Sequence, residues 1–289
     1  MMKPSSSFYR SIKHIISSSS FSSFGDVRGC SLVMLRHYTN VTDIQDDTEP
    51  FSLIDPNRIP GLGDTWRDEN MSCEILRPGM ILLKNYVNIL GQTGIINTCQ
   101  KWGVGPAGFY EPKNQYGHEL RRHITSFGKN WDPLTGYNNP YRSDGSEPPA
   151  IPYELVHLTK TAIEVAQSYM DELPSMYPDT CLVSHYSTCG RLGLHQDSDE
   201  SVDSLKKGLP VVSISVGDAA EFWYGDTRDE NKLRNVILDT GDVLIFGGKS
   251  RLIFHGVKRI LPGYSVNTIE IAKVVMIRPG RLNLTLKQF

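Results

Sequence analysis

Two histidines and an aspartate have the types and spacing of ligands to a single metal ion. His195 and Asp197 stand two positions apart, and side chains two apart on a β-strand leave from the same face. A second imidazole, His255, follows the apolar run 252–254. Two imidazoles and one carboxylate form the facial ligand set of non-heme Fe(II) oxygenases, which leaves positions for a co-substrate and O₂. A hydrogen-bonded surface pair would also explain His195 and Asp197.

The C-terminal residues alternate between polar and apolar side chains, as a strand with two different faces does. One face carries leucines, and the other carries Arg281, Asn283, Thr285 and Lys287. If this polar face points into a barrel that holds the metal ligands, Arg281 and Lys287 approach one site from positions about 20 Å apart along the backbone. Two such cations can hold the two ends of a short dicarboxylate such as 2-oxoglutarate. Exposure of the polar face to solvent is the alternative.

The elements that would position these residues are short strands separated by glycine turns. We expect strands at 181–186, 193–197, 211–216, 221–224, 236–238, 243–246, 252–255 and 281–287. Such regular spacing predicts a β-sandwich or barrel of the jelly-roll class. An apolar run at 80–87 predicts another strand, and helical periodicity appears at 89–102 and 153–173. The segment 103–152 is rich in glycine, proline and aromatic residues, so we expect loops and short strands there, a common vehicle for substrate-binding lids.

The N-terminal residues have a composition of their own. The first 25 contain ten serines, three lysines or arginines and no acidic residue, which is typical of an organellar transit peptide or of a disordered tail. We expect residues 1–40 to be such a peptide or tail, 41–74 a linker, 75–177 N-terminal helices and a lid, and 178–289 the catalytic core. A transit peptide would direct the protein to a mitochondrion or chloroplast; otherwise we expect it in the nucleus or cytoplasm.

Composition excludes several classes of protein. With 289 residues, 39% hydrophobic and 21% charged, the chain suits a globular protein with a sizeable core. No stretch approaches the roughly 20 apolar residues of a membrane-spanning helix. A net charge of −2 argues against a polyanion-binding coat, although a local basic groove is compatible with it. Five cysteines without a C-x-x-C pair indicate a reducing compartment and no cysteine-based zinc site. The G-x-G-x-x-G match at 103–108 contains Pro106 and follows no buried strand, so we interpret it as a loop.

From Cys181 onward, over more than a third of the chain, the sequence resembles the catalytic core of the AlkB family of Fe(II)/2-oxoglutarate-dependent nucleic-acid dealkylases. The matching pieces are, in order, Tyr186, 193–200, 210–215, 241–248, 250–252, 255–256 and 281–285. The resemblance implies an α+β fold, in which flanking helices and a nucleotide-recognition lid surround a double-stranded β-helix (jelly-roll) core. It also implies that His195, Asp197 and His255 are the catalytic iron ligands.

The same resemblance assigns residues to the co-substrate and to the substrate. Tyr186, Arg281 and Asn283 would surround 2-oxoglutarate, and Asp199 falls where the family contacts the target base. Two further co-substrate positions depart from the family: Ser184 replaces an asparagine, and Lys287 replaces an arginine. Serine is a shorter donor, and lysine lacks the planar fork that grips a carboxylate. We therefore expect weakened binding of 2-oxoglutarate, which Lys287→Arg should strengthen.

The function implied is oxidative demethylation of N-methylated bases in DNA or RNA, using Fe(II), 2-oxoglutarate and O₂ and releasing formaldehyde, succinate and CO₂. The target base must be flipped out or single-stranded. Candidate stacking residues are Phe109, Tyr110, Phe127 and Trp131, and candidate phosphate contacts are Lys206, Lys207, Arg228, Lys249 and Arg251.

The target base and two other functions stay open. The runs HQDSDES and RPGRLNLT are most similar to members associated with N6-methyladenine in DNA; N1-methyladenine and N3-methylcytosine are alternatives. A nucleic-acid-binding pseudoenzyme, disabled through Ser184 and Lys287, is one rival, and an oxygenase of proteins or small molecules is another. We expect a monomer that binds methylated DNA or RNA and no membrane.

Overall fold

The computed structural model describes residues 66–103, 108–113, 122–142, 144–264 and 280–289. They belong to one compact unit, Ile54–Phe289. The other unit, Met1–Leu53, contains the expected transit peptide or tail at 1–40 and lies outside the described residues. Within the described part of the chain, no helix is both long and apolar enough to cross a membrane.

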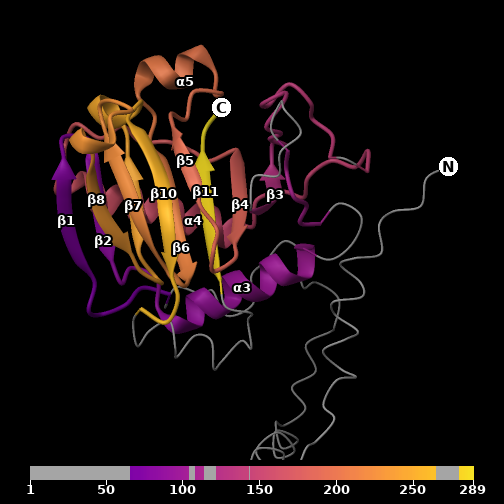
Figure 1. Cartoon of the computed structure of the whole chain (residues 1–289), viewed down its shortest axis with the longest axis horizontal. Coiled ribbons are helices and arrows are strands. Elements are labelled where there is room, and N and C mark those ends of the chain that lie inside the picture. The colour runs from indigo at the N-terminus through magenta and orange to yellow at the C-terminus, as the bar shows by residue number, and fades with distance from the viewer. Residues whose placement is uncertain (1–65, 104–107, 114–121, 143, 265–279) are drawn as a thin grey trace, which may run out of the picture. The chain divides into compact units, whose positions relative to one another are not determined.

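Two antiparallel sheets form the centre of this structure (Figure 1). The larger has the strand order β1 (Ser72–Arg77), β2 (Met80–Lys84), β9 (Val243–Phe246), β6 (Val211–Gly217), β11 (Arg281–Lys287), β4 (Thr180–Tyr186) and β3 (His123–Gly128). The smaller has the order β5 (Leu192–His195), β10 (Phe254–Leu261), β7 (Ala219–Gly225) and β8 (Arg234–Leu238). Neighbouring strands are mostly far apart in the sequence, because the chain passes repeatedly between the two sheets. This arrangement confirms the expected jelly-roll core.

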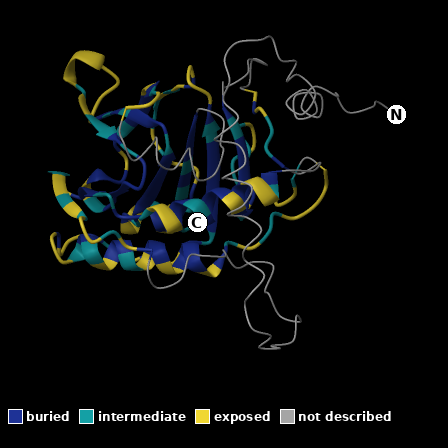
Figure 2. Ribbon diagram, turned by 90° about the horizontal axis from the view of Figure 1, so that it is seen from below, coloured by how far each residue is buried: buried dark blue, intermediate teal, exposed yellow. Residues whose placement is uncertain are grey.

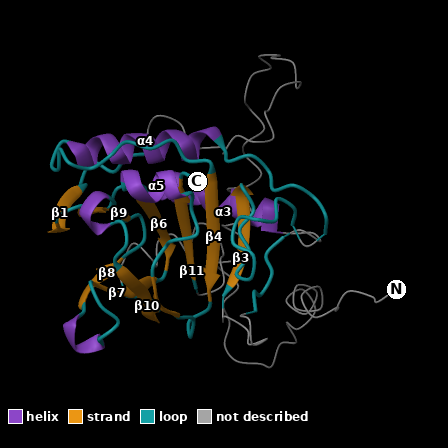
Figure 3. Cartoon of the chain, turned by 90° about the horizontal axis from the view of Figure 1, so that it is seen from above, coloured by secondary structure: helices purple, strands orange, loops and turns teal. Residues whose placement is uncertain are grey.

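Helices cover one face of the larger sheet. The two long ones, α3 (Ile89–Gly103) and α4 (Tyr153–Gln167), lie on the face that points away from the smaller sheet (Figures 1 and 3). The short helix α5 (Val202–Lys207) follows the loop after β5, and 3₁₀ turns occupy Glu230–Lys232 and Gly248–Ser250. The central strands of the larger sheet are mostly buried, whereas β1, β5 and β8 are partly exposed and the helices expose their outer sides (Figure 2).

Alternation along the strands divides the apolar side chains between two cores. The first lies between the helices and the larger sheet, where Leu284 and Leu286 of β11 pack with Ile95 of α3 and Leu158 of α4. Because successive side chains of a strand leave opposite faces, the polar side chains of β11 point the other way, into the space between the two sheets.

The second core fills part of that space. Met80 and Phe246 of the larger sheet meet Phe222 and Val257 of the smaller one. The strands β2 and β9 are apolar on both faces because they contribute to both cores at once. The polar face of β11, which could equally have faced solvent, therefore lies inside the protein, and a cavity opens beside it.

The structure corrects several expected boundaries. Trp66 is buried and β1 begins at Ser72, so the globular part starts within the expected linker 41–74. The strands β2 and β3 from the expected N-terminal region 75–177 join the same sheet as strands from 178–289, so the two regions share one core. Helix α4 ends six residues before Leu173, at the point where the hydroxyl of Ser168 donates to the backbone oxygen of Val165.

Candidate active site

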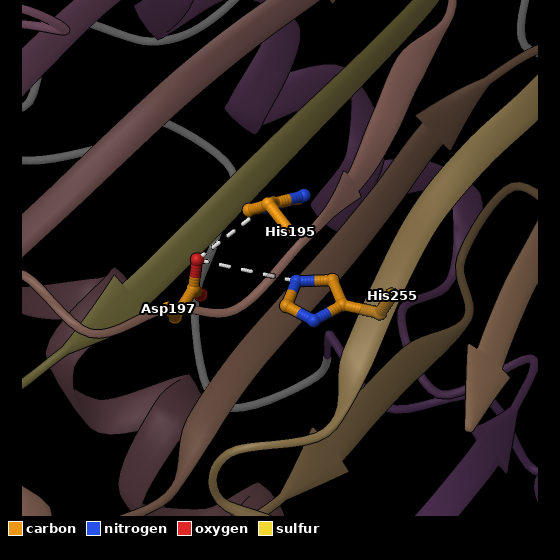
Figure 4. A group of neighbouring side chains, drawn as sticks. All are labelled: His195, Asp197 and His255. Carbon is orange, nitrogen blue, oxygen red and sulfur yellow. Dashed lines mark ion pairs between the residues drawn. The ribbon is translucent and has the colours of Figure 1, made fainter. Parts of the chain in front are cut away.

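His195, Asp197 and His255 meet at one end of the smaller sheet (Figure 4). Their ligand atoms all lie within 4.8 Å of one another. Nε2 of His195 is 3.5 Å from Oδ1 of Asp197, and Nε2 of His255 is 4.0 Å from the same oxygen. The three residues thus form the convergent donor group that their spacing suggested.

Strand register brings the two histidines together. His195 ends β5, and it is the direct partner of His255 on β10, so their rings lie 4.3 Å apart. Two expectations are wrong in detail. His255 is the second residue of β10 and does not end a strand at 252–255, and Asp197 lies in the loop beyond β5 and not on a strand with His195. The loop turns the carboxylate back towards both rings.

Backbone carbonyls fix the orientation of both imidazoles. Nδ1 of His195 is 2.9 Å from the carbonyl oxygen of Gly193, and Nδ1 of His255 is 3.2 Å from that of Ile253. Since a carbonyl only accepts, Nδ1 carries the proton and Nε2 presents its lone pair to the centre of the group. Burial lowers the pKa of His255 to about 4, which keeps that imidazole neutral. Neutral imidazoles and an ionised carboxylate are what a divalent metal requires.

A closed network of charges surrounds the aspartate. Nζ of Lys287 lies 3.4 Å from Oδ2 of Asp197 and 2.5 Å from Oε1 of Glu200. Arg251 donates from Nη2 to Oε2 of Glu200 at 2.7 Å and from Nη1 to the backbone oxygen of Asp197 at 2.6 Å. Burial opposes ionisation of Asp197, but Lys287 and the two histidines outweigh it and hold the pKa of this carboxyl well below its usual value. Each cation of this network has a carboxylate partner.

The expected co-substrate residues lie in the same cavity, on the larger sheet. Arg281 is 1% exposed, and it donates from Nη1 to the backbone oxygens of Asp218 and Leu238 and from Nη2 to the hydroxyl of Ser215. Burial lowers the pKa of Arg281 to about 10. All of its hydrogen-bond acceptors among the described residues are neutral, and its Nε is buried without a partner. Arg281 is therefore a buried cation without a paired anion.

The remaining predicted residues complete this wall of the cavity. Tyr186 and Ser184 of β4 and Asn283 of β11 line it, together with Lys287. Asn283 donates to the hydroxyl of Ser213 at 2.7 Å. The empty space of the cavity, with its open mouth included, measures about 850 Å³. The part of these residues in binding 2-oxoglutarate stays a prediction.

Asp199, the residue expected at the target base, lies at the mouth of the cavity. Its Oδ2 accepts a hydrogen bond from the indole Nε1 of Trp131 at 2.9 Å, and both residues line the cavity. Of the four aromatic residues considered for stacking, Trp131 is therefore placed to meet a ligand. Phe127 is not, because it is 1% exposed in the core beneath the helices.

The sequence-based interpretation of Arg251 was wrong, and Arg122 was missed. Arg251 was expected at a phosphate, but it is 3% exposed and bonded to Glu200. Arg122 carried no expectation, yet it lines the cavity from the residue just before β3. No motif marks Arg122, because its partners come from a distant strand; only its place in a lid segment close to Trp131 hinted at it.

Comparison with known proteins agrees with this geometry. A family model described as the 2OG-Fe(II) oxygenase superfamily matches residues 79–287. The solved structure of OsALKBH1 is 47% identical, covers 75% of this chain and 100% of its own, and superposes with a TM-score of 0.71. An AlkB homologue from Caulobacter vibrioides is 32% identical over 73% of this chain and 88% of its own length. The chain therefore belongs to the AlkB family within the 2OG-Fe(II) oxygenase superfamily.

Plant relatives in this family are longer than the matched region. The DNA N(6)-methyladenine demethylase ALKBH1C of Arabidopsis thaliana is 46% identical over 74% of this chain and 49% of its own length. This chain thus spans about half the length of the curated Arabidopsis relatives it matches.

The side chains present fit the family's cofactors. The two Nε2 lone pairs and one carboxylate oxygen provide the facial donor set of Fe(II). Beside them, the unpaired guanidinium of Arg281 suits a carboxylate of 2-oxoglutarate. The expected cofactors, Fe(II), 2-oxoglutarate and O₂, are thus those of the family and agree with the donor set.

Proposed function

We propose that this protein removes N-methyl groups from bases of DNA or RNA by oxidation, consuming 2-oxoglutarate and O₂ and releasing formaldehyde, succinate and CO₂. The observation that carries the proposal is the convergence of His195, Asp197 and His255 in a cavity that also holds a buried cation without an anion, Arg281. The similarity to Arabidopsis relatives named as DNA N(6)-methyladenine demethylases supports the class of substrate.

Each wall of the cavity has its own task in the proposed reaction. His195, Asp197 and His255 hold Fe(II), which supplies oxidation of the methyl carbon by O₂ while 2-oxoglutarate is decarboxylated. Arg281 would bind one carboxylate of 2-oxoglutarate, and the hydroxyl of Tyr186 and the amide of Asn283 line the same cavity and would donate to the co-substrate. Ser184 and Lys287 contribute further donors. These contacts orient the co-substrate before a base enters.

The methylated base enters at the mouth, where Asp199 and Trp131 lie. A base within a duplex cannot reach a centre this deep, so the substrate is single-stranded or flips its base out. The indole of Trp131 offers a stacking surface. The carboxylate of Asp199, oriented by the hydrogen bond from that indole, accepts from an exocyclic amino group of the base. Among methylated bases we favour N6-methyladenine in DNA, because the Arabidopsis relatives are named for it.

Formaldehyde release tests this proposal and separates it from its rivals. Purified protein is incubated with Fe(II), 2-oxoglutarate and oligonucleotides of DNA and RNA that carry N6-methyladenine, N1-methyladenine or N3-methylcytosine. The proposal expects formaldehyde that depends on 2-oxoglutarate and disappears in His255→Ala. Nucleic-acid binding without decarboxylation would instead indicate a pseudoenzyme. Decarboxylation without nucleic-acid binding would indicate an oxygenase of other substrates.

We also propose a location and an assembly state, which concern the whole protein. Residues 1–40 are proposed to act as a transit peptide to a mitochondrion or chloroplast, because of their serine-rich, acid-poor composition over the first 25 residues. A fusion of residues 1–40 to a fluorescent protein should enter an organelle, and a diffuse signal would contradict the idea. We propose that the enzyme acts as a monomer, which light scattering at micromolar concentration would check.

A further inference from the structure

Within the described part of the chain, Arg122 is a second buried cation of the cavity without a paired anion. Arg122 is 7% exposed, and its buried Nε has no hydrogen-bond partner among the described residues. Among the described residues it has no carboxylate within ion-pair distance, unlike Lys287 and Arg251, which pair with Glu200. Taking a cation out of water costs free energy that a paired anion normally offsets. A ligand with a negative charge would supply the anion that Arg122 lacks.

The surroundings of Arg122 indicate where such a ligand would lie. The register of β3 on β4 pairs His123 with His185, so Arg122 stands beside Tyr186. Its Nη1 is 3.5 Å from both the hydroxyl of Tyr186 and the hydroxyl of Ser184. Those distances are long for hydrogen bonds, so the guanidinium retains donor capacity towards the cavity. Three donors from Arg122, Ser184 and Tyr186 therefore surround one part of the cavity wall.

We propose that Arg122 binds a carboxylate oxygen of 2-oxoglutarate, together with the hydroxyls of Ser184 and Tyr186. This inference rests on the function proposed above and adds a residue to it. Ser184 has a shorter reach than the asparagine common in the family, and the guanidinium of Arg122 supplies a donor at that point. The co-substrate is thereby held by Arg281 from β11 and by Arg122 from the segment beside the lid.

The position of Arg122 favours the co-substrate over the nucleic acid as its ligand. Phosphates of a bound strand lie outside the cavity, whereas Arg122 is nearly buried and its Nη1 approaches hydroxyls of the inner strand β4. The guanidinium lies over the ring of Trp131, 6.0 Å from its centroid, so the indole covers one face of it. An entering base would meet Trp131 and Asp199 at the mouth.

Binding of 2-oxoglutarate can be measured without turnover. Mn(II) replaces Fe(II) in protein kept free of O₂, and 2-oxoglutarate is titrated by calorimetry. Arg122→Gln should raise the dissociation constant of 2-oxoglutarate by about 10- to 100-fold, as expected for the loss of a charge-assisted hydrogen bond. Arg122→Lys, which keeps the charge but loses the fork, should weaken it less.

The control variant is Arg142→Gln. Arg142 is bonded to Thr125 and Ser126 of the same strand β3 but lies outside the cavity, so its loss tests mere disturbance of that strand. It should bind 2-oxoglutarate as the wild type does. Thermal unfolding without ligands checks that each variant folds. If Arg122→Gln does not fold, the comparison of Arg122→Lys with the wild type is the test.

Three results would overturn the inference. Wild-type protein that binds 2-oxoglutarate while Arg122→Gln binds it within about threefold would remove Arg122 from the co-substrate site and leave the proposed function intact. Weakened binding of a fluorescent single-stranded oligonucleotide with unchanged 2-oxoglutarate affinity would assign Arg122 to the nucleic acid. Wild-type protein that binds no 2-oxoglutarate would remove both the inference and the proposed function.

Discussion

Two parts of the cavity wall differ in how their charges are balanced. In the part next to the metal ligands, Lys287 and Arg251 both pair with Glu200, and Lys287 also lies near Asp197. At the other end of β11, Arg281 and Arg122 are also buried but have only neutral acceptors among the described residues. We call the first part the paired wall, because each of its cations has a carboxylate partner, and the second part the unpaired wall.

This difference separates structural charges from binding charges. A buried ion pair that is already satisfied holds its members in place and has little left to offer a ligand. A buried cation with neutral acceptors gains most when an anion arrives, since the anion removes an existing penalty. The paired wall is therefore suited to orient Asp197 for the metal, and the unpaired wall to receive the carboxylates of 2-oxoglutarate.

The largest effect is expected from the metal ligands themselves. His255→Ala should reduce demethylation below detection, because two remaining donors do not form the facial set. The fold should survive, because the ring lines the cavity near the start of β10. His157→Ala, at an exposed position of α4, serves as the control and should be fully active. Near-normal formaldehyde release by His255→Ala would remove His255 from the ligand set.

Breaking the paired wall should cost stability. Lys287→Met leaves the buried Glu200 with one partner in place of two, and loss of one member of a buried ion network typically costs about 3–5 kcal/mol. Urea unfolding of metal-free protein measures the change in unfolding free energy. Lys258→Met removes an exposed pair with Glu230 and should cost less than about 1 kcal/mol. Equal losses of unfolding free energy in the two variants would show that the buried network stabilises the fold no more than an exposed ion pair does.

Lys287→Arg isolates the role that the sequence assigns to Lys287 at the co-substrate. The arginine keeps the charge and restores the planar fork that the family carries at this position. The sequence-based prediction is a KM for 2-oxoglutarate lowered by about 10- to 100-fold with little change in kcat. Titration of 2-oxoglutarate against formaldehyde release checks it. An unchanged KM would confine Lys287 to its two carboxylate partners.

The smallest effect concerns the mouth of the cavity. Trp131→Phe keeps an aromatic ring but removes the hydrogen bond from the indole to Asp199. A bond of this kind contributes about 0.5–1.5 kcal/mol. The KM for a methylated oligonucleotide should therefore rise about 2- to 10-fold, while the affinity for 2-oxoglutarate stays constant. A changed 2-oxoglutarate affinity would show that Trp131 acts through Arg122, which it covers.

The sequence predicted the parts of the site that lie on regular elements. The alternation of β11 placed Arg281 and Asn283 on one face, because a strand has a fixed period of two. The convergence of His195 with His255 depended on the register of β5 on β10, which no local pattern shows. The family motif gave it instead.

Charge pairing was beyond the reach of the sequence. Arg251 was expected on the surface because arginine usually is, and only the position of Glu200 in three dimensions shows that both are buried. Short strands were expected within 103–152, but the limits of β3 were not predicted, because glycine, proline and aromatic residues around it mark loops. The pairing of β3 with β4 makes this segment a strand and places Arg122 beside Tyr186.

A single matched measurement tests the division between the two walls most directly. Arg281→Met and Arg251→Met make the same chemical change at two buried arginines, one on each wall. The dissociation constant of 2-oxoglutarate is measured for both by anaerobic calorimetry at saturating Mn(II). Arg281→Met should weaken binding by at least about tenfold, and Arg251→Met should remain within about threefold of the wild type. Equal weakening in the two variants would contradict the division.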